Sequence, residues 1–466
     1  MKKDVKLNCG AGGGDSSAQY SNTPTLQHSI AVVGLWHQGI VGAACLADLG
    51  CDVLAADMDE AKIESLKAGK APLYEPGLNE LIKKGLESGR LRFTADVAGA
   101  VQGRASVMLM HDTPVDENDH SDLEVVFRDV RAMAPNMESD TLLFVTAQVP
   151  VGTCDRIATE IRNVNPGAHF GIAYSPENLR LGQAIERFLK PPLPVIGADD
   201  SRTLDRIEQM LAPLGAEWKR VDLRTAEMTK HALNAFLATT VTFANELGNL
   251  CDEVGADGVR LAEVLRMEPR VGPKAMLLPG LGFSGGTLAR DMQTLRNLGD
   301  RAGVETPMLD GVWSANRAQN RLVVRKLKRS FGRLDGVRVA VLGLTYKPDT
   351  STLRRSAAIE IIGDMVREKM IVVAHDPMAD RAEVAKHKEF IFVDDVYEAL
   401  RGARAAVIIT GWADYRKLDL DKIKALMANP LVVDVNNMLD ADVLEKKGIT
   451  CLNVGRGRHS GKMDMT

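Results

Sequence analysis

A regular alternation of short apolar runs with amphipathic segments, interrupted by one long middle stretch, limits the possible folds of this sequence more than any other feature. Such alternation is typical of βαβ units and of a mostly parallel sheet covered by helices. It occurs twice, once from Ser29 and again from Asp335. The expected strands are residues 29–35, 52–57, 92–96, 106–111, 142–147, 169–174 and 193–197 in the first set, and 337–344, 371–376, 390–393, 405–410, 431–435 and 450–454 in the second.

The stretch between the two sets is expected to be helical. It contains no strand candidate from about Thr225 to Gly255, and its apolar residues recur at helical spacing. A second helical stretch is expected at roughly 308–329. The sequence therefore predicts an α/β fold in which two doubly wound Rossmann-like domains are joined by a long helical middle segment. The predicted division is a disordered tail at 1–28, a first domain at 29–216, the helical segment at 217–330, a second domain at 331–458 and a loose tail at 459–466.

Composition excludes several classes of protein. The net charge of −4 over 466 residues gives no reason to expect nucleic acid or an anionic membrane as a partner. The longest apolar runs are of strand length, well short of the ~20 residues that a membrane-spanning helix needs. The six cysteines have neither metal-ligand spacing nor a disulfide framework, which indicates a reducing compartment. Because the first 28 residues also lack the apolar core of a secretory signal, we expect a cytoplasmic protein without a metal ion.

The first expected strand leads into a candidate phosphate-binding loop. Gly34 and Gly39 stand where a Rossmann fingerprint has its first and last glycine, and Asp57 closes the next strand. A carboxylate at that position accepts both ribose hydroxyls and repels a 2′-phosphate, which favours NAD over NADP. Trp36 replaces the middle glycine, which normally lets the backbone approach the pyrophosphate. A doubly wound domain without a dinucleotide is the alternative, and the strand–loop–helix–strand–Asp context favours NAD.

The middle segment carries a candidate catalytic face. Lys230 and Asn234 lie four residues apart on the expected long helix and so point to one side, which Glu227 shares one turn earlier. A desolvated lysine beside an amide can act as an acid, as a base or as a stabiliser of an oxyanion. A solvated lysine near the start of a helix is the alternative, and spacing alone favours it.

A glycine-rich loop follows at 279–291. Its glycines, Gly282 and Gly285 among them, indicate backbone pressed against a ligand. The helix that begins there would present Thr287 and Asp291 four residues apart. A flexible connector is the alternative.

Short motifs in a fixed order link these segments. They are Leu-Tyr-Glu-Pro-Gly at 73–77, Asp-Thr-Pro-Val-Asp at 112–116, Ser-Pro-Glu-Asn-Leu at 175–179, Ala-Glu-Met-Thr-Lys-His-Ala-Leu-Asn-Ala-Phe-Leu-Ala at 226–238, Phe-Ala-Asn-Glu at 243–246, Arg-Val-Gly at 270–272, the glycine-rich loop, Gly-Leu-Thr-Tyr-Lys-Pro at 343–348, Arg354 with Ser356, and His-Asp-Pro at 375–377. Together they resemble the UDP-glucose/GDP-mannose dehydrogenase family of nucleotide-sugar 6-dehydrogenases, from about Ser29 to Val454.

The resemblance implies an N-terminal NAD domain, a helical segment that forms a homodimer, and a C-terminal domain that binds a nucleotide sugar, most simply a UDP-sugar. It implies a four-electron oxidation of the C6 alcohol to a carboxylate with two NAD, in which a cysteine forms a thiohemiacetal and then a thioester. The family roles that map onto this sequence are stabilisation of the alkoxide and oxyanion by Lys230 and Asn234, proton transfer by Asp291, ordering of water near the reacting carbon and the cofactor by Thr113, a place beside the substrate for Glu177, sugar-nucleotide contacts from Lys347 and Arg354, and a contact from Arg270 to the substrate of the partner subunit.

The sequence departs from the family pattern at several site positions. Thr287 stands where the family has its nucleophilic cysteine, and an alcohol lacks the thiolate fraction that makes cysteine reactive. Leu181 replaces a glutamate, Gln148 belongs to a pair that is usually two small hydroxyl residues, and Asn436 replaces an arginine.

Three explanations therefore stay open. The chain is a dehydrogenase that reaches the acid without a thioester, an oxidoreductase that stops at the aldehyde, or a non-catalytic relative that binds a nucleotide sugar. Retention of Lys230, Asn234 and Asp291 favours an enzyme, because a pure binder needs no group that stabilises an alkoxide.

Overall fold

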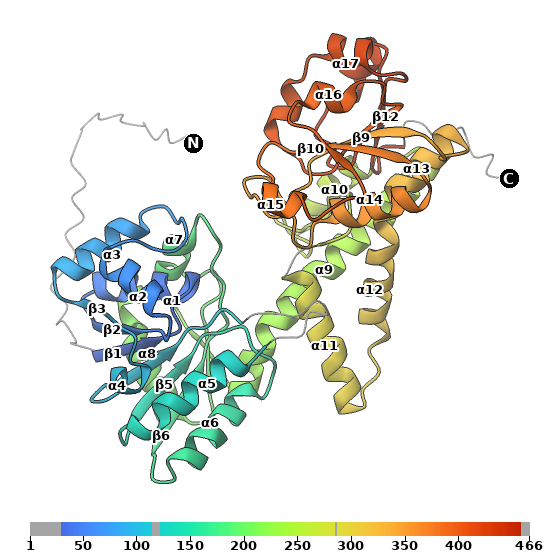
Figure 1. Cartoon of the computed structure of the whole chain (residues 1–466). Coiled ribbons are helices and arrows are strands. Elements are labelled where there is room, and N and C mark those ends of the chain that lie inside the picture. Colours follow the sequence, from blue (N-terminus) through green and yellow to red (C-terminus); the bar gives the residue numbers. More distant parts are fainter. Residues whose placement is uncertain (1–28, 114–121, 285–286, 458–466) are drawn as a thin grey trace, which may run out of the picture.

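Two parallel sheets of the same strand order form the two ends of the molecule. The computed structural model describes residues 29–113, 122–284 and 287–457. The first sheet has the order β3-β2-β1-β4-β5-β6-β7-β8, and the second has the order β11-β10-β9-β12-β13-β14. Figure 1 shows them as separate domains with helices α9, α11 and α12 between them. In each sheet the chain runs outward from the first strand, β1 or β9, to one edge and then returns to build the other side from β4 or β12. This strand order is that of doubly wound nucleotide-binding folds.

The N-terminal domain has a single antiparallel strand pair, between β6 and β7. Strands β4 and β5 are buried along their whole length, as expected for central strands that are covered by helices on both faces. Its strands are β1 (Ser29–Val33), β2 (Asp52–Ala56), β3 (Leu91–Thr94), β4 (Ser106–Leu109), β5 (Thr141–Val145), β6 (Phe170–Tyr174), β7 (Val195–Ala198) and β8 (Lys219–Val221). Its helices are α1 (His37–Asp48), α2 (Glu60–Lys67), α3 (Leu78–Glu87), α4 (Val97–Ala100), α5 (Glu124–Met133), α6 (Thr153–Val164), α7 (Ala184–Leu189) and α8 (Ser201–Leu211).

The C-terminal domain is wholly parallel among its described strands. Apolar clusters cover both of its faces, one from α13 and α14 and the other from α16 to α18. Its strands are β9 (Arg338–Leu342), β10 (Ile371–His375), β11 (Ile391–Phe392), β12 (Ala405–Ile408), β13 (Leu431–Asp434) and β14 (Thr450–Asn453). Its helices are α14 (Ala357–Arg367), α15 (Arg381–Val384), α16 (Val396–Leu400), α17 (Leu420–Leu426) and α18 (Ala441–Lys446).

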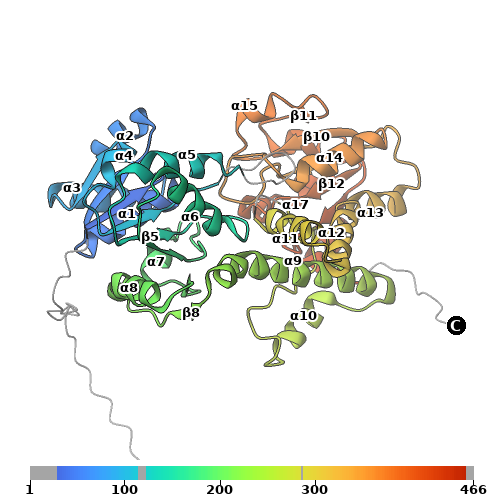
Figure 2. The same ribbon diagram turned by 90° about the horizontal axis from the view of Figure 1, so that it is seen from below.

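The middle segment is built on one long helix, α9 (Leu223–Val254), which Asp222 caps through the amide of Thr225. Figure 2 shows α9 running from the N-terminal domain to beneath the C-terminal domain. The other helices of this segment are α10 (Gly258–Arg266), α11 (Leu288–Ala302), α12 (Pro307–Gln319) and α13 (Leu322–Phe331). Helices α11 and α12 pack on α9 around Ala235, Ala238 and Met292.

The fold class predicted from the sequence is confirmed, and each expected strand is present within a few residues of its predicted ends. Two details differ. Strand β8 was not expected, because its sequence Lys-Arg-Val carries two exposed charges and pairs with β7 at the sheet edge. The helical stretch expected at 308–329 is two helices, because the chain turns at Asn320, whose side chain donates to Glu360 at 2.7 Å.

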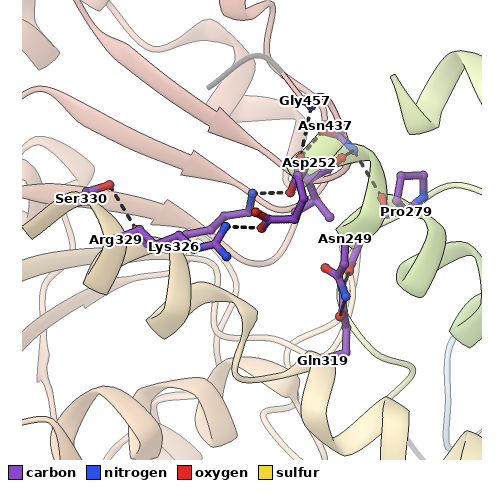
Figure 3. A network of polar contacts seen from close by, with 12 residues as sticks. Asn249, Asp252, Pro279, Gln319, Lys326, Arg329, Ser330, Asn437 and Gly457 are labelled. Atoms are coloured by element: carbon purple, nitrogen blue, oxygen red, sulfur yellow. Dashed lines mark hydrogen bonds and ion pairs between the residues drawn. The ribbon is translucent and has the colours of Figure 1, made fainter. Parts of the chain in front are cut away.

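Polar contacts fix the far end of α9 to the C-terminal domain (Figure 3). Lys326 of α13 pairs with Asp252 of α9 at 2.6 Å, and the pair is largely shielded from solvent. The amide of Gly457 donates to the other oxygen of Asp252 at 3.3 Å, and Asn249 donates to Gln319 at 2.9 Å. One helix is thus tied to α12, to α13 and to the end of the C-terminal domain.

Candidate active site

The loop after β1 has the geometry of a dinucleotide-binding turn. Gly34 has a φ of +92°, and a Cβ there would lie 2.8 Å from the His111 ring. At Gly39 a Cβ would lie 1.9 Å from the carbonyl oxygen of Gly34, so α1 can approach the turn only without a side chain. Both outer glycines of the fingerprint are therefore required by close packing. Trp36 begins α1 with its side chain 49 % exposed, so the indole is not buried in the turn.

Asp57 lies at the carboxyl end of β2, facing this turn. Its Oδ2 accepts the amide of Leu35 at 2.8 Å and the ammonium of Lys62 at 2.7 Å, and its Oδ1 accepts the amide of Asp59 at 3.0 Å. The carboxylate is thus fixed next to the loop, with lone pairs remaining on Oδ1. The structure thus places Gly34, Gly39 and Asp57 together at one turn, and their contact with the adenosine and pyrophosphate of NAD stays a prediction.

The corresponding carboxylate of the C-terminal domain accepts more hydrogen bonds than Asp57 does. Asp376 follows β10, and its Oδ2 accepts the amides of Leu344 and Thr345 at 2.7 and 2.9 Å, the Thr345 hydroxyl at 3.1 Å and the Trp412 indole at 3.1 Å. Its Oδ1 accepts the amide of Met378 at 2.9 Å. Oδ2 of Asp376 thus accepts four hydrogen bonds, whereas Oδ2 of Asp57 accepts two, so the two domains, alike in strand order, differ at the same place.

Glu227 anchors α9 to the N-terminal domain and does not join a catalytic group. Its carboxylate accepts the amides of Gly152 and Cys154 at 2.6 and 2.8 Å, at the first turn of α6. A carboxylate at a helix N-terminus is favoured by the helix dipole. Burial raises the pKa of Glu227 despite these hydrogen bonds. The start of α9 is therefore held in register with the sheet.

Two turns further along α9, Asn234 belongs to a buried cluster centred on Asp291 of α11. The fully buried carboxylate accepts hydrogen bonds from the Asn234 amide and, at 2.7 Å, from the His231 ring. The Gln148 amide donates to both carboxylate oxygens, at 2.6 and 2.7 Å. Burial alone raises the pKa of Asp291, but the hydrogen bond and charge of His231 and the hydrogen bond of Asn234 hold that pKa below its ordinary value.

Lys230 is directed to a different group of partners. Its side chain is only 7 % exposed, and its ammonium lies 3.4 Å from Oδ1 of Asn178 in the loop after β6. Burial raises the pKa of the neighbouring Glu177, and the charge of Lys230 partly offsets this rise. The structure thus brings Lys230 and Glu177 together, and Lys230 is a buried lysine rather than the solvated lysine that was the alternative.

Thr113 and the glycine-rich loop complete the site. Thr113 follows β4, is buried and donates to the carbonyl of Gln148 at 2.7 Å. Gly282 is buried against Asn316, whose side chain bridges the amide and carbonyl of Phe283 at 2.7 and 3.0 Å. Gly285 lies outside the described residues. Thr287 is exposed and begins α11, where its carbonyl accepts the amide of Asp291 at 3.1 Å, so the two residues are one turn apart as predicted.

Three predicted substrate-binding residues lie apart from this cluster. Lys347 follows β9 on the C-terminal domain, with its ammonium 5.5 Å from the centre of the Tyr346 ring. Arg354 is exposed in the loop before α14. Arg270 follows α10 on the surface and pairs with Glu268 at 2.7 Å. The structure therefore places these cations on two other parts of the chain, and their role in binding stays a prediction.

Each described cysteine is buried. Burial raises the pKa of the Cys45 thiol to about 12, with Asp48 adding to the rise. Burial likewise raises the pKa of Cys51, Cys154 and Cys251. Among the described residues there is thus no exposed thiol. The same residues contain no group of three or more His, Cys, Asp or Glu side chains suited to a metal ion, and no described helix is long and apolar enough to cross a membrane.

His231, Gln148 and Asn178 are the site residues that sequence reasoning did not assign. His231 was visible next to Lys230 in the helix motif, and Gln148 was visible only as a departure from the family pattern. A larger polar side chain such as Gln148 at a buried position must find a hydrogen-bond partner, and this indicates an interaction at that position. That partner, Asp291, lies 143 residues away, which no local spacing indicates.

The collected groups stand at the carboxyl ends of β1, β4, β5 and β6, where doubly wound sheets bind their ligands. With a dinucleotide turn, a buried lysine and a buried carboxylate–amide cluster, the fold and site define an NAD-linked oxidoreductase with a second nucleotide-binding domain. Comparison with known proteins agrees. Family models match the NAD binding domain at residues 28–215, the central domain at 224–318 and the UDP binding domain at 340–441. The chain belongs to the UDP-glucose/GDP-mannose dehydrogenase family.

The relatives are similar over nearly their whole length. The chain is 35 % identical to a UDP-glucose 6-dehydrogenase of Rhizobium meliloti, over 92 % of this chain and 99 % of the relative. It is 32 % identical to the UDP-glucose 6-dehydrogenase TuaD of Bacillus subtilis, over 92 % and 93 %. A UDP-glucose dehydrogenase structure from Pyrobaculum islandicum superposes with a TM-score of 0.81 at 30 % identity, covering 93 % of this chain and 98 % of that one. The family resemblance and the NAD cofactor expected from the sequence are thereby confirmed.

Replacing Trp36 by glycine is expected to tighten NAD binding. The backbone could then approach the pyrophosphate as it does in loops with a middle glycine, and we expect the Kd measured by calorimetry to fall about tenfold, or ~1.4 kcal/mol. Trp36→Phe, which keeps an aromatic ring at the loop, is the matched control and should bind like the unmodified protein. Equal or weaker binding by Trp36→Gly would show that the indole does not hinder the cofactor.

Proposed function

We propose that this chain oxidises the C6 alcohol of a nucleotide sugar, with a UDP-sugar of the glucose type as the substrate and the uronic acid as the end product. The observation that carries the proposal is the buried Lys230, one turn from Asn234, at the carboxyl edge of an NAD-binding sheet. A lysine and an amide so placed suit an alcohol whose oxygen becomes negative as the C6–H bond breaks. The names of the relatives and the UDP binding domain matched at 340–441 support the choice of a UDP-sugar.

In this proposal each part of the chain has a separate task. Gly34, Gly39 and Asp57 would hold NAD, which when bound supplies the hydride acceptor. Lys230 and Asn234 stabilise the developing charge on the C6 oxygen. Thr113, fixed to the Gln148 carbonyl, orders water beside the reacting carbon, and the partly buried Glu177 lies beside the substrate and Lys230.

The C-terminal domain would bind the nucleotide part of the substrate. Lys347 and Arg354 lie in the loop between β9 and α14, where a doubly wound sheet presents its ligand-binding edge. Their positive charges suit a diphosphate. In a dimer, the exposed Arg270 would reach the substrate of the partner subunit.

Thr287 favours a second candidate, a two-electron oxidation that ends at the aldehyde. The second oxidation by way of a thioester needs a thiol at this position, and the described cysteines are buried elsewhere with raised pKa values where a shift is resolved. Without that thiol, only the aldehyde hydrate can give up the second hydride. The first oxidation, which depends on Lys230 and Asn234, is unaffected by the change.

The proposed activity predicts NADH formation with a nucleotide sugar. Absorbance of NADH should rise when NAD is mixed with a panel of UDP- and GDP-sugars, and Lys230→Met should lower kcat by about 10²–10⁴-fold. The matched control is Lys84→Met, because Lys84 pairs with Asp48 on the surface of α3 far from the site. Absence of NADH with every sugar, together with measurable sugar-nucleotide binding, would assign the chain to the non-catalytic class.

Thr287→Cys is expected to raise the proportion of acid among the products. A cysteine at neutral pH has a few per cent of thiolate, enough to trap the aldehyde, whereas the threonine hydroxyl has essentially none. Mass spectrometry after hydroxylamine trapping would measure the ratio of acid to aldehyde. Thr287→Ser, which keeps a hydroxyl, is the control and should leave that ratio unchanged. The same ratio in the cysteine variant would mean that the missing thiol does not limit the second oxidation.

We further propose that the chain forms a homodimer through α9. Phe236, Phe243 and Leu250 recur every seven residues along α9 and are 66, 50 and 60 % exposed. Seven residues are close to two helical turns, so the three side chains form one apolar stripe. Val264 and Met267 at the end of α10 are also exposed. A second copy of the stripe would remove this surface from water, at about 1.5–3 kcal/mol for each large side chain fully buried.

Phe243→Glu should therefore shift the protein from dimer to monomer. Two like charges would meet at the centre of a symmetric interface without a partner, and sedimentation equilibrium would report the loss of mass. Val164→Glu, at an exposed apolar residue that ends α6 in the N-terminal domain, is the control. A Phe243→Glu variant that keeps the mass of the parent protein would contradict an interface on this face of α9.

A further inference from the structure

The hydrogen bonds around Asp291 determine where protons reside in the cluster. The two oxygens of this carboxylate receive four hydrogen bonds, two from the Gln148 amide and one each from His231 and Asn234. Amide nitrogens only donate, so Asp291 acts as an acceptor at both oxygens. The hydrogen bonds from the neutral Gln148 and Asn234 amides, together with the lowered pKa of Asp291, favour the ionised carboxylate.

The His231 ring is placed between two acceptors. Nδ1 lies 2.7 Å from Oδ1 of Asp291, and Nε2 lies 2.9 Å from the carbonyl oxygen of Val149. A backbone carbonyl can only accept, so Nε2 carries a proton, and an ionised carboxylate can only accept, so Nδ1 carries one as well. The ring is then an imidazolium that compensates the buried charge of Asp291, and both side chains are almost completely buried.

We propose that His231 and Gln148 are positioning residues for Asp291. His231 is the protonated counter-ion that keeps Asp291 a fixed carboxylate. Because His231 compensates that charge, Lys230 does not pair with Asp291. This proposal rests on the proposed function, because it concerns how the same site is assembled. Asp291 in turn orients the Asn234 amide, and Gln148 links the cluster to Thr113 through its own carbonyl.

The division of charges explains how a lysine and an aspartate can share one site. If Lys230 were the counter-ion of Asp291, its ammonium would be held in that pair. Its described contact is instead with Asn178, 3.4 Å away, beside Glu177. A long contact to a neutral amide leaves the ammonium available to a substrate oxygen, whereas a buried ion pair would hold it strongly.

Other charged groups surround the cluster and must be considered with it. Arg290 precedes Asp291 on α11, and its charge also lowers the pKa of that carboxyl. Glu227 and Lys230 belong to α9, and Glu177 follows β6. Tyr174 at the end of β6 donates to the carbonyl of Ala147 at 3.0 Å. Its pKa is raised far above the ordinary value, mainly by burial and also by nearby carboxylates that include Asp291. Among these groups and the hydrogen-bonding partners of Asp291, His231 is the cation in direct contact with the carboxylate.

The first test observes the proton and needs no turnover. In protein labelled at the histidine Cε1 carbon, the NMR resonance absent from His231→Asn identifies this ring. At about pH 8, where an unpaired imidazole is neutral, the resonance should have the chemical shift of an imidazolium. In Asp291→Asn, where the charge to be compensated is removed, it should move to the neutral position. A neutral ring in the unmodified protein would overturn the proposal.

The second test measures the pH dependence of kcat for NADH formation. His231→Asn can still donate one hydrogen bond but carries no charge, so the pKa of Asp291 should rise, and the acid side of the kcat profile should move to higher pH. KM for the nucleotide sugar should stay within about twofold, because His231 does not contact the substrate. His387→Asn is the matched control, since His387 also pairs with a carboxylate, Glu389 at 2.6 Å, but on the C-terminal domain.

A variant of Gln148 separates positioning from folding. Gln148→Leu keeps the volume and removes the hydrogen bonds to both Asp291 oxygens, so kcat should fall about 10–100-fold while the thermal unfolding temperature stays close to that of the parent. An unmoved acid limb in His231→Asn, or full kcat in Gln148→Leu, would show that these residues are merely structural. If the unmodified protein forms no NADH while His231 is an imidazolium, the proposed function fails and the assignment of the proton stands.

Discussion

The unbroken course of α9 is the constraint on which the rest of the structure depends. Near its start, Glu227 accepts two amides at the first turn of α6, and near its end Asp252 pairs with Lys326 and the amide of Gly457. Between these fixed points, one helix of 32 residues brings Lys230 and Asn234 to the carboxyl edge of the first sheet. A rigid helix sets both the height and the rotation of these side chains. A kink or a shift of one residue would move the lysine away from the strand ends and tilt the second domain.

The same strand order serves two different ligands because the residues after the second strand of each sheet are used differently. Asp57 accepts two hydrogen bonds at Oδ2, from Leu35 and Lys62, whereas Oδ2 of Asp376 accepts four, from its own loop and from Trp412. The topology makes both sheet edges suitable for a nucleotide. The local hydrogen bonds therefore make the two carboxylates differ, although the strands that carry them are equivalent.

Much of this architecture follows from local sequence patterns, because strands buried on both faces require continuous apolar runs that are visible along the chain. The outer glycines, Asp57 and the Lys230–Asn234 pair can also be predicted from the sequence, because each depends only on short spacing along the chain. Strand β8 could not be predicted, because its pairing is made by backbone groups under charged side chains. The partners of Asp291 could not be predicted either, since Gln148 lies in the first domain and meets α11 only after the chain has folded.

The departures from the family pattern concern different parts of the chemistry. Asn436, where the family has an arginine, donates to the carbonyls of Ile408 and Ile409 at 3.2 and 3.0 Å, so its amide connects the ends of two strands. Leu181 is 58 % exposed and leaves the partly buried Glu177 as the carboxylate of its loop. In the proposed function, Thr287 affects only the second oxidation, and Lys230 and Asn234, proposed for the first, are both buried. An enzyme that had lost its function altogether would have no reason to retain a buried lysine and a buried aspartate, because each is costly without its partners. The cost of Asp291 is offset here by His231 and Gln148, whose hydrogen bonds hold the pKa of that carboxyl low and its two oxygens in place.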